Sequence, residues 1–485
     1  MDNQKAGAQI SQKSFIQSVL ILLALMVASG LLTLFVPAGS YQRETLPDGR
    51  ETIIPGTFTQ VERPDYPFWR WFTAPVEVLG AEGNLTIIVI IIFLLFVGIA
   101  FAILDKSGIL KAALGKIVAR YGGQKYALLL AISFFFMCLG AFFGIFEEVL
   151  PLVPLMVALA YSLGWDALTG LGMSILATNV GFSTAITNPF TIGVAQKLAG
   201  LPLFSGWQPR LLLFALAYLL LAFFLTRYAK KVEMNPQASP VFADESAERK
   251  RYRDFKFDTD SVSASDLKRA GIWLAVFLLL LLATLTAAPF VPFLTDYALP
   301  VVGLLFLLAG VGAGFLSGAG AKTVLQAVGE GVVGIAPAIP LVLMAASVKH
   351  IVASGGILDT ILFNAAGIFE NVSAFGASLL VYAIALVVEF FIGSGSAKAV
   401  LLMPILLPLS DLVGVTRQIA VTAYCFGDGF SNLAYPTNPV LLISLGLTVV
   451  SYPKWIKWLA GLWVWMFVLT IAFLAVAVAV GYGPF

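Results

Sequence analysis

The chain has 485 residues, of which 59% are hydrophobic and only 12% are charged, and its formal net charge is +2. No soluble core needs that much apolar surface, and segments such as 84–105 and 269–291 reach the roughly 20 apolar residues that cross a bilayer. We therefore expect an all-α polytopic membrane protein rather than a soluble enzyme. Cys138 and Cys425 fall in apolar segments and His350 is the only histidine, which argues against a disulfide framework and a structural zinc site.

The apolar segments, taken in chain order, predict about nine transmembrane helices. The first, Phe15–Val36, is too long for the core of a signal peptide and has no small-residue cleavage site, so we expect a retained helix. The expected spans lie near 14–36, 84–105, 167–199, 207–229, 269–291, 298–318, 331–352, 415–448 and 455–480.

Two further apolar blocks, 125–163 and 372–413, are too long for one crossing and are interrupted in the middle, by GAFFGIFEE at 140–148 and GSGSAK at 393–398. Each block is either two crossings or a re-entrant hairpin that enters and leaves on one side. The arms of the first block, about 125–141 and 148–163, are shorter than a full span needs. This favours two re-entrant hairpins.

Lysine and arginine residues orient the chain by the positive-inside rule. They precede the first span, follow the second, fill the segment 249–256 and precede the last span, and all of them fall inside if the N-terminus is cytoplasmic. The loop 37–83 is then outside. The polar linker 232–268 is expected to be flexible and cytoplasmic.

Three motifs recur in the same order and divide the chain into two halves. They are SGIL at 107–110 with GGIL at 355–358, GFS at 181–183 and 429–431, and TNP at 187–189 and 437–439. The first two pairs are 248 residues apart and the third 250, so the second copy carries two extra residues. The charge pattern makes the hairpins enter from opposite sides, which is the inverted repeat of secondary transporters. The expected divisions are a first half at 1–231, the linker at 232–268, a connecting helix at 269–297 and a second repeat at 298–485.

Glycine, proline and polar residues interrupt two of the expected spans, 167–199 and 415–448, near their middles. Broken backbone at membrane depth is tolerated where it is buried in protein or lines a cavity. Its free carbonyls and amide groups can bind cations and anions. We therefore expect two hairpin tips, near Gly144 and Gly395, and two broken helices to meet at one midplane site.

Four segments, FEEVLPLVPL, NVGFSTAITNPFTIGVAQKLAGLP, GSGSAKAVLLMPILLPLSDLVGVTRQ and FGDGFSNLAYPTNPVLL, resemble the YfcC/DcuC family of bacterial carriers, and the resemblance runs over nearly the whole chain. It implies the fold of the divalent-anion/sodium symporters and the aminobenzoyl-glutamate transporters. The resemblance also implies a homodimer in the bacterial inner membrane. Each subunit would have a scaffold domain and an elevator-type transport domain that holds the hairpins. Members of the family are described for C4-dicarboxylates and for basic amino acids, so the resemblance leaves the substrate open.

The first tip carries Glu147 and Glu148, and the second carries Lys398 with Ser394, Gly395 and Ser396. The two acids either complement the dipole of a helix start or contact substrate or a coupling proton. Lys398 in a first helical turn opposes the dipole, so it either binds a carboxylate or forms a salt bridge to Glu147 or Glu148 across the tips.

The two helix breaks supply the remaining candidates. Asp428 and Asn179 are expected at the breaks, where they either bind a coupling cation such as sodium or cap a helix end. Other polar side chains either bond substrate or satisfy the broken backbone: Ser183, Thr187, Asn188, Asn432, Thr437 and Asn438.

These residues indicate a secondary active transporter without a resident cofactor, which uses Na⁺ or H⁺ as the coupling ion or works by exchange. Acids and a lysine at one site fit a basic or zwitterionic amino acid best. A C4-dicarboxylate is the alternative substrate, and a channel is the alternative class, although the sequence has no pore-loop filter or repeated charge ring.

Overall fold

The computed structural model describes residues 12–45, 51–81, 84–245, 263–287, 291–369 and 372–483. Helices dominate these residues. The strands form two small antiparallel pairs in the loop that follows the first helix, with Gly39 opposite Gln60 and Arg43 opposite Ile53. The strands are β1 (Gly39–Ser40), β2 (Arg43–Thr45), β3 (Glu51–Ile53) and β4 (Thr59–Gln60).

The helices fall into two matching series with additional helices before and between them. The first series is α3 (Asn84–Lys106), α4 (Ile109–Tyr121), α5 (Lys125–Cys138) with its π-helical extension η3 (Leu139–Phe143), η4 (Glu147–Leu152), α6 (Val153–Ser162), α7 (Ala167–Leu171), η5 (Gly172–Leu176), α8 (Ala177–Thr184), η6 (Pro189–Gly193), α9 (Val194–Leu198) and α10 (Trp207–Met234). The second series is α15 (Ala338–Ser354), α16 (Leu358–Ala366), α17 (Ala374–Glu389), α18 (Gly395–Leu412), α19 (Arg417–Ser431), α20 (Pro439–Gly446) and α21 (Tyr452–Ala479). The additional helices are α1 (Gln12–Phe35), α2 (Arg70–Glu77), α12 (Ala264–Ala287), α13 (Pro292–Leu316) and α14 (Ala321–Ile335).

Local backbone features recur at the offset that the sequence motifs predict. Gly108 and Gly356, which are 248 residues apart, both have positive φ, at 78° and 70°, and each connects a spanning helix to a short helix. Gly164 and Gly414, which are 250 apart, also share positive φ, at 89° and 73°. Because this conformation costs energy for residues with a Cβ, the glycines fix equivalent turns in the two halves. The repeat is therefore present in the structure as well as in the sequence.

Seven helices in the described residues are long and apolar enough to cross a membrane. They are Phe15–Phe35, Ile87–Lys106, Lys125–Phe143, Trp207–Met234, Ala321–Ser354, Gly395–Leu412 and Tyr452–Ala479. This pattern is that of a multi-pass membrane protein, as expected. The number of nine crossings stays a prediction, because two of the expected spans are broken helices and others are shorter apolar helices.

The length argument for re-entrant hairpins is weaker than the sequence suggested. The helix of α5 continues through η3 to Phe143, which gives an arm of 19 residues, and α18 provides an arm of 18 residues. Both arms meet the length of a spanning helix, whereas α6 and α17 do not. The π-helical extension, which the sequence did not signal, adds these residues to the first arm.

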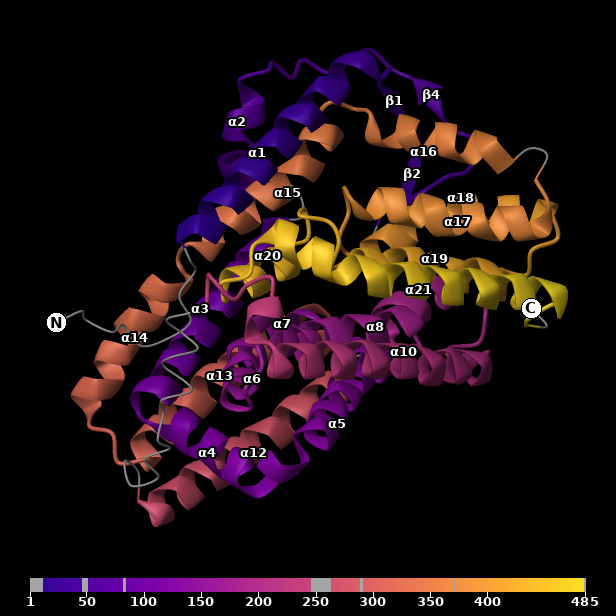
Figure 1. Ribbon diagram of the computed structural model, residues 1–485. Helices are drawn as coiled ribbons and strands as arrows, with labels where there is room; N and C mark the ends of the chain where they lie inside the picture. Colours follow the sequence, from indigo (N-terminus) through magenta and orange to yellow (C-terminus); the bar gives the residue numbers. More distant parts are fainter. Residues whose placement is uncertain are drawn as a thin grey trace.

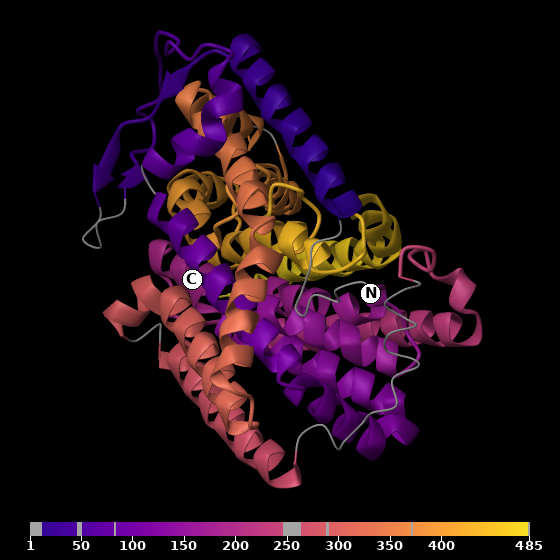
Figure 2. The same cartoon turned by 90° about the vertical axis from the view of Figure 1, so that its left-hand side faces the viewer.

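The broken helices lie at the centre of the molecule, and the other helices pack around them (Figure 1). α8 and α19 contact each other, α5 packs on α8, and α17 packs on α19 in the equivalent manner. Helices α13 and α14 pack on α3 on one side, and α12 packs on α13. Figure 2 shows α14 and α15 following each other in one long column, along which α1 packs on α15.

The linker is more ordered than its composition predicts. Asp244 forms an ion pair with Lys454, and the buried Glu245 accepts a hydrogen bond of 3.1 Å from the Ala167 amide. Ser239 donates to Asp166, which is itself the N-cap of α7. The expectation of a flexible linker is therefore wrong for residues 235–245, because these polar side chains satisfy a helix start. Residues 246–262 of the linker lie outside the described part of the chain.

Candidate functional site

The two broken helices are interrupted where the repeated TNP motif predicts. α8 ends at Thr184 and η6 begins at Pro189, and α19 ends at Ser431 and α20 begins at Pro439. In the first break Ala185 takes a left-handed conformation with φ of 46°. The second break is longer, which is consistent with the increase of the motif offset from 248 to 250.

The asparagine of each TNP motif caps the helix that follows the break. Asn188 Oδ1 accepts from the amides of Phe190 at 2.9 Å and Thr191 at 3.3 Å, and Asn438 Oδ1 accepts from the Val440 amide at 3.0 Å. Each cap is typically worth about 1 kcal/mol. Asn438 Nδ2 also donates to Asn432 Oδ1 at 2.9 Å, so the second break is closed by its own side chains. The side chains of these asparagines therefore form hydrogen bonds to the broken backbone and to each other, which is one of the two roles that the sequence left open.

Asn179 and Asp428 do not lie at the breaks. Both are inside the preceding helices, in α8 and α19, and the C-cap positions are Ala185 and Asn432. The interpretation of either residue as a helix cap is therefore wrong. The buried Asn179 Oδ1 has no hydrogen-bond partner among the described residues, which leaves an acceptor available for a ligand.

The two halves touch next to Asp428 through a repeated glycine. A Cβ added at Gly429 would lie 2.5 Å from the Ser183 Cα, so the backbones of α19 and α8 are closer there than any side chain allows. Ser183 itself donates back to the Asn179 carbonyl at 2.7 Å. The GFS motif is thus a packing motif, and its serine in the first copy satisfies its own helix.

Both tips reach η6, the turn that follows the first break. A Cβ at Gly144 would lie 2.2 Å from Asn188 Oδ1, and a Cβ at Gly395 would lie 2.7 Å from Thr191 Cγ2. The first tip is also bonded to the break, because Thr187 Oγ1 donates to the Phe142 carbonyl at 3.0 Å. The structure therefore brings the two tips and the first break together, as the repeat predicts.

Lys398 is the only fully buried lysine among the described residues, and it lies between two carboxylates. Its Nζ is 2.8 Å from Asp428 Oδ1 and also forms an ion pair with Glu389. The side chains of all three are at most 1% exposed. The expected alternative of a salt bridge to Glu147 or Glu148 is wrong, because the acid at the end of α17 and the acid in α19 take that place.

Glu147 and Glu148 extend this charged cluster toward the first tip. Both are half-buried, Glu148 Oε2 accepts from the Phe146 amide at 3.1 Å, and no ion pair joins either acid to a base in the described part of the chain. Glu147 lies within electrostatic range of Asp428, and Glu148 within range of Glu147. We call Glu148, Glu147, Asp428, Lys398 and Glu389 the central charge cluster.

The remaining predicted residues carry hydroxyl groups and are more exposed than Lys398. Ser394 is exposed and caps α18, with its Oγ 3.5 Å from the Ala397 amide. Ser396 is half-buried with its Oγ 3.5 Å from that of Ser394, and Thr437 is half-buried in the second break. These hydroxyl groups are accessible to a solute in a way that Lys398 is not.

Sequence reasoning missed two buried charged residues. Glu389, the last residue of α17, is nine residues from Lys398 across the second tip, and the two side chains form an ion pair. Arg210 of α10 is fully buried, and its guanidinium donates to the Ile186 and Ser205 carbonyls, both at 3.0 Å, and to the Tyr482 hydroxyl. Arg210 thus holds the first break to the C-terminal end. Each of the two is an ionisable residue within an apolar segment, and this pattern alone marks a residue as a candidate for a functional role.

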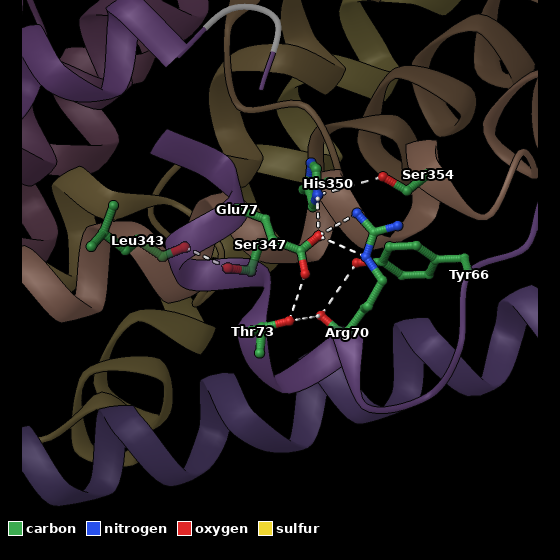
Figure 3. Close-up of polar contacts among 8 residues, drawn as sticks. All are labelled: Tyr66, Arg70, Thr73, Glu77, Leu343, Ser347, His350 and Ser354. Carbon is green, nitrogen blue, oxygen red and sulfur yellow. Dashed lines mark hydrogen bonds and ion pairs between the residues drawn. The ribbon is translucent and has the colours of Figure 1, made fainter. Parts of the chain in front are cut away.

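A second polar cluster joins α2 to the C-terminal half of α15 (Figure 3). Glu77 of α2 accepts from Arg70 at 2.7 Å and from Thr73, and His350 Nε2 of α15 lies 3.4 Å from the same carboxylate. The Arg70 guanidinium lowers the pKa of Glu77 from 4.5 to about 2. These contacts attach the loop helix α2 to α15, so His350 is part of a tether between the two helices.

The sequence matches a family model over residues 15–479, the model of the C4-dicarboxylate anaerobic carrier family, DcuC. The chain belongs to the DcuC family. A relative from Escherichia coli (strain K12) is 29% identical over 96% of both chains, and its name, YfcC, provisionally describes a basic amino acid antiporter. A protein of unassigned function from Haemophilus influenzae is 26% identical over 83% of this chain and 77% of its own. The predicted membership of the YfcC/DcuC carriers is confirmed, and a DcuC-family protein is a bacterial multi-pass membrane transporter rather than an enzyme.

Two solved transporter structures align along almost the whole DcuC-family chain. The Alcanivorax borkumensis YdaH transporter covers 97% of this chain and 99% of its own at 20% identity, with a TM-score of 0.43. Neisseria gonorrhoeae MtrF, from a class of antimetabolite efflux pumps, covers 94% of both chains at 19% identity, with a TM-score of 0.44.

Proposed function

We propose that this DcuC-family carrier is a secondary active transporter of a carboxylate-bearing solute with a positive charge, a basic or zwitterionic amino acid. The observation that supports the proposal is the central charge cluster, in which Lys398 pairs with Glu389 and Asp428, and Glu147 and Glu148 supply two further acids. A net negative site within apolar surroundings attracts a cationic group and repels a second negative charge.

The carboxylate of the solute has a separate binding region in this proposal. Helix α18 starts at Gly395 with the half-buried Ser396 in its first turn, and a helix N-terminus offers free amide groups to an anion. The hydroxyls of Ser394, at the N-cap of α18, and of the half-buried Thr437 would supplement these donors. An amino acid would then place its cationic end toward Asp428 and Glu147 and its carboxylate toward α18.

Coupling is proposed to use Na⁺ or H⁺, or exchange of two solutes. Asp428 and the unpartnered oxygen of Asn179 are in neighbouring broken helices that touch at Gly429 and Ser183. Oxygen ligands on interrupted helices suit a coupling cation. Asn188 and Asn432, in the breaks themselves, would line the solute path.

The membrane arrangement completes the proposal. Two opposed re-entrant hairpins would carry the tips to the midplane of the bacterial inner membrane, and a cytoplasmic N-terminus follows from the positive-inside rule. The tips and broken helices would form the moving transport domain of an elevator, in a homodimer held by scaffold helices.

The second candidate substrate is a C4-dicarboxylate, which the description of the family model names. Thermal unfolding of the purified protein with arginine, a neutral amino acid and succinate, each with and without sodium, tests the choice. Stabilisation by arginine that exceeds that by succinate supports the proposal. Stabilisation by succinate alone would replace it with the dicarboxylate.

A further inference from the structure

We infer that Glu389 and Asp428 form a receptor for an alkylammonium or guanidinium group, and that Lys398 occupies it as a resident cation which the substrate displaces. The inference rests on the proposed function for the identity of the displacing solute. It adds Glu389 to the binding residues. It also gives Lys398 a second role, in addition to the expected binding of the substrate carboxylate.

The geometry of the three residues supports a receptor. Glu389 is the last residue of α17, Lys398 is in the first turn of α18, and Asp428 is in α19, so three different elements point charged groups at one place. Lys398 Nζ pairs with both carboxylates, and all three side chains are closed off from solvent. Two carboxylates around one ammonium is the arrangement that would hold the cationic end of arginine or lysine as a ligand.

The charge balance indicates that the resident cation can be exchanged. Two acids against one lysine leave one formal negative charge. Lys398 also lies at a helix N-terminus, where the dipole disfavours a cation. An arriving ammonium group would therefore find partners already in place, and the displaced lysine could turn toward the substrate carboxylate.

Glycine residues at the second tip allow its backbone to approach the two carboxylates of the receptor closely. A Cβ at Gly395 would lie 3.0 Å from Asp428 Oδ2, and the Tyr424 hydroxyl donates to the Gly395 carbonyl. Gly393 faces Glu389, because its Cβ would lie 3.7 Å from Glu389 Oε1. Movement of the tip would thus open the receptor and separate Lys398 from Asp428.

Chemical rescue of Lys398→Met tests the receptor without requiring transport. The variant leaves two buried carboxylates without a cation, so its thermal unfolding midpoint should fall. Methionine fills the lysine stem and omits only Nζ, so millimolar ammonium chloride should restore the midpoint. Wild type should not respond. Lys106→Met is the matched control, because it breaks a half-exposed ion pair with Glu330 at the other side of the molecule, where water replaces the lost partner.

The double variant Glu389→Gln/Lys398→Met keeps the test informative if the single variant fails to fold. Removing one charge of each sign should give a higher midpoint than Lys398→Met, and at least a tenfold weaker response to ammonium, because one carboxylate is missing. Equal responses of Lys398→Met and wild type to ammonium would overturn the inference, as would a response that does not depend on Glu389. A different outcome is rescue of Lys398→Met together with wild-type protein that arginine does not stabilise and that does not transport arginine. This outcome would support the receptor and contradict the proposed substrate.

Discussion

The Lys398 ammonium lies 2.8 Å from the Asp428 carboxylate, and the two residues come from the tip and the broken helix of the second repeat. Both are buried, so the pair is stable only while tip and helix stay together. Any movement that admits a solute between α18 and α19 must therefore provide new partners for both charges. This requirement links substrate binding to the position of the tip.

Asp428→Asn should remove coupling without unfolding the protein. Glu389 still pairs with Lys398 in the variant, so the thermal unfolding midpoint should fall only slightly. The dependence of uptake on a sodium or proton gradient should disappear, because Asp428, three residues before the end of α19, is the proposed cation ligand. Uptake in proteoliposomes under each gradient measures this. Wild-type gradient dependence in the variant would mean that Asp428 serves only the ion pair.

Asn188 can be tested for binding and capping separately. Asn188→Ser keeps an acceptor for the amides of η6, so we expect a midpoint close to wild type, whereas Asn188→Ala should lose about 1 kcal/mol of folding free energy. The serine also removes the buried Asn188 Nδ2, which has no partner among the described residues. If Nδ2 faces the solute path, Asn188→Ser should raise the apparent KM. An unchanged KM would leave Asn188 as a cap alone.

Gly429→Ala should separate the two broken helices. Its Cβ would lie 2.5 Å from the Ser183 backbone, and overpacking of this kind typically costs about 1–3 kcal/mol. Gly461→Ala in α21 is the control, because that Cβ meets nothing within 4 Å. We expect lower thermal stability and loss of uptake for the first variant and neither for the second. Equal stability of both would show that α8 and α19 are not in close contact.

Glu77→Gln should weaken the tether between α2 and α15 in a pH-dependent way. The Glu77 pKa falls from 4.5 to about 2 because Arg70 donates to the carboxylate, so its contribution to stability is present above pH 4.5 and is lost as the pH falls toward 2. The variant should therefore be less stable than wild type at pH 7, and the difference should shrink between pH 4.5 and 2. The exposed Glu62→Gln is the control. A difference that is constant with pH would contradict this assignment.

Glu148→Gln and Lys398→Ala should affect substrates differently. Glu148→Gln removes one negative charge from the central charge cluster, which should lower the affinity for arginine by about tenfold or more, since a charge-assisted hydrogen bond is worth about 1.5–3 kcal/mol. Transport of a dianion should suffer less. Lys398→Ala should abolish transport of every carboxylate-bearing solute. Radiolabelled uptake of arginine, a neutral amino acid and succinate by both variants measures these effects, and an equal loss for arginine and succinate in Glu148→Gln would count against the charge argument.

Short-range patterns predicted much of the fold. Hydropathy located α1, α3, α10 and α21 to within a few residues, since a spanning helix needs a continuous apolar run. The TNP motifs located both breaks, because asparagine before proline caps a helix start. The extension of α5 by η3 could not be foreseen, because a π-helical turn depends on the packing of Gly140 against α8.

The partners of buried charges were beyond the reach of the sequence. Glu147, Glu148, Glu389 and Asp428 were all available to Lys398, and only the fold selects the last two. The docking of residues 239–245 was missed for the same reason, since Glu245 and Asp166 gain their roles from contacts with distant segments. Composition described that segment correctly as polar and gave no information on what its side chains bond.

The central claim is that the carrier selects a solute with a positive charge, and the exchange of labelled arginine in proteoliposomes tests it most directly. Vesicles loaded with unlabelled arginine should accumulate external labelled arginine transiently by counterflow, which a channel does not support. Unlabelled lysine outside should inhibit this uptake, and succinate should not. Counterflow of labelled succinate together with no movement of arginine would contradict the account.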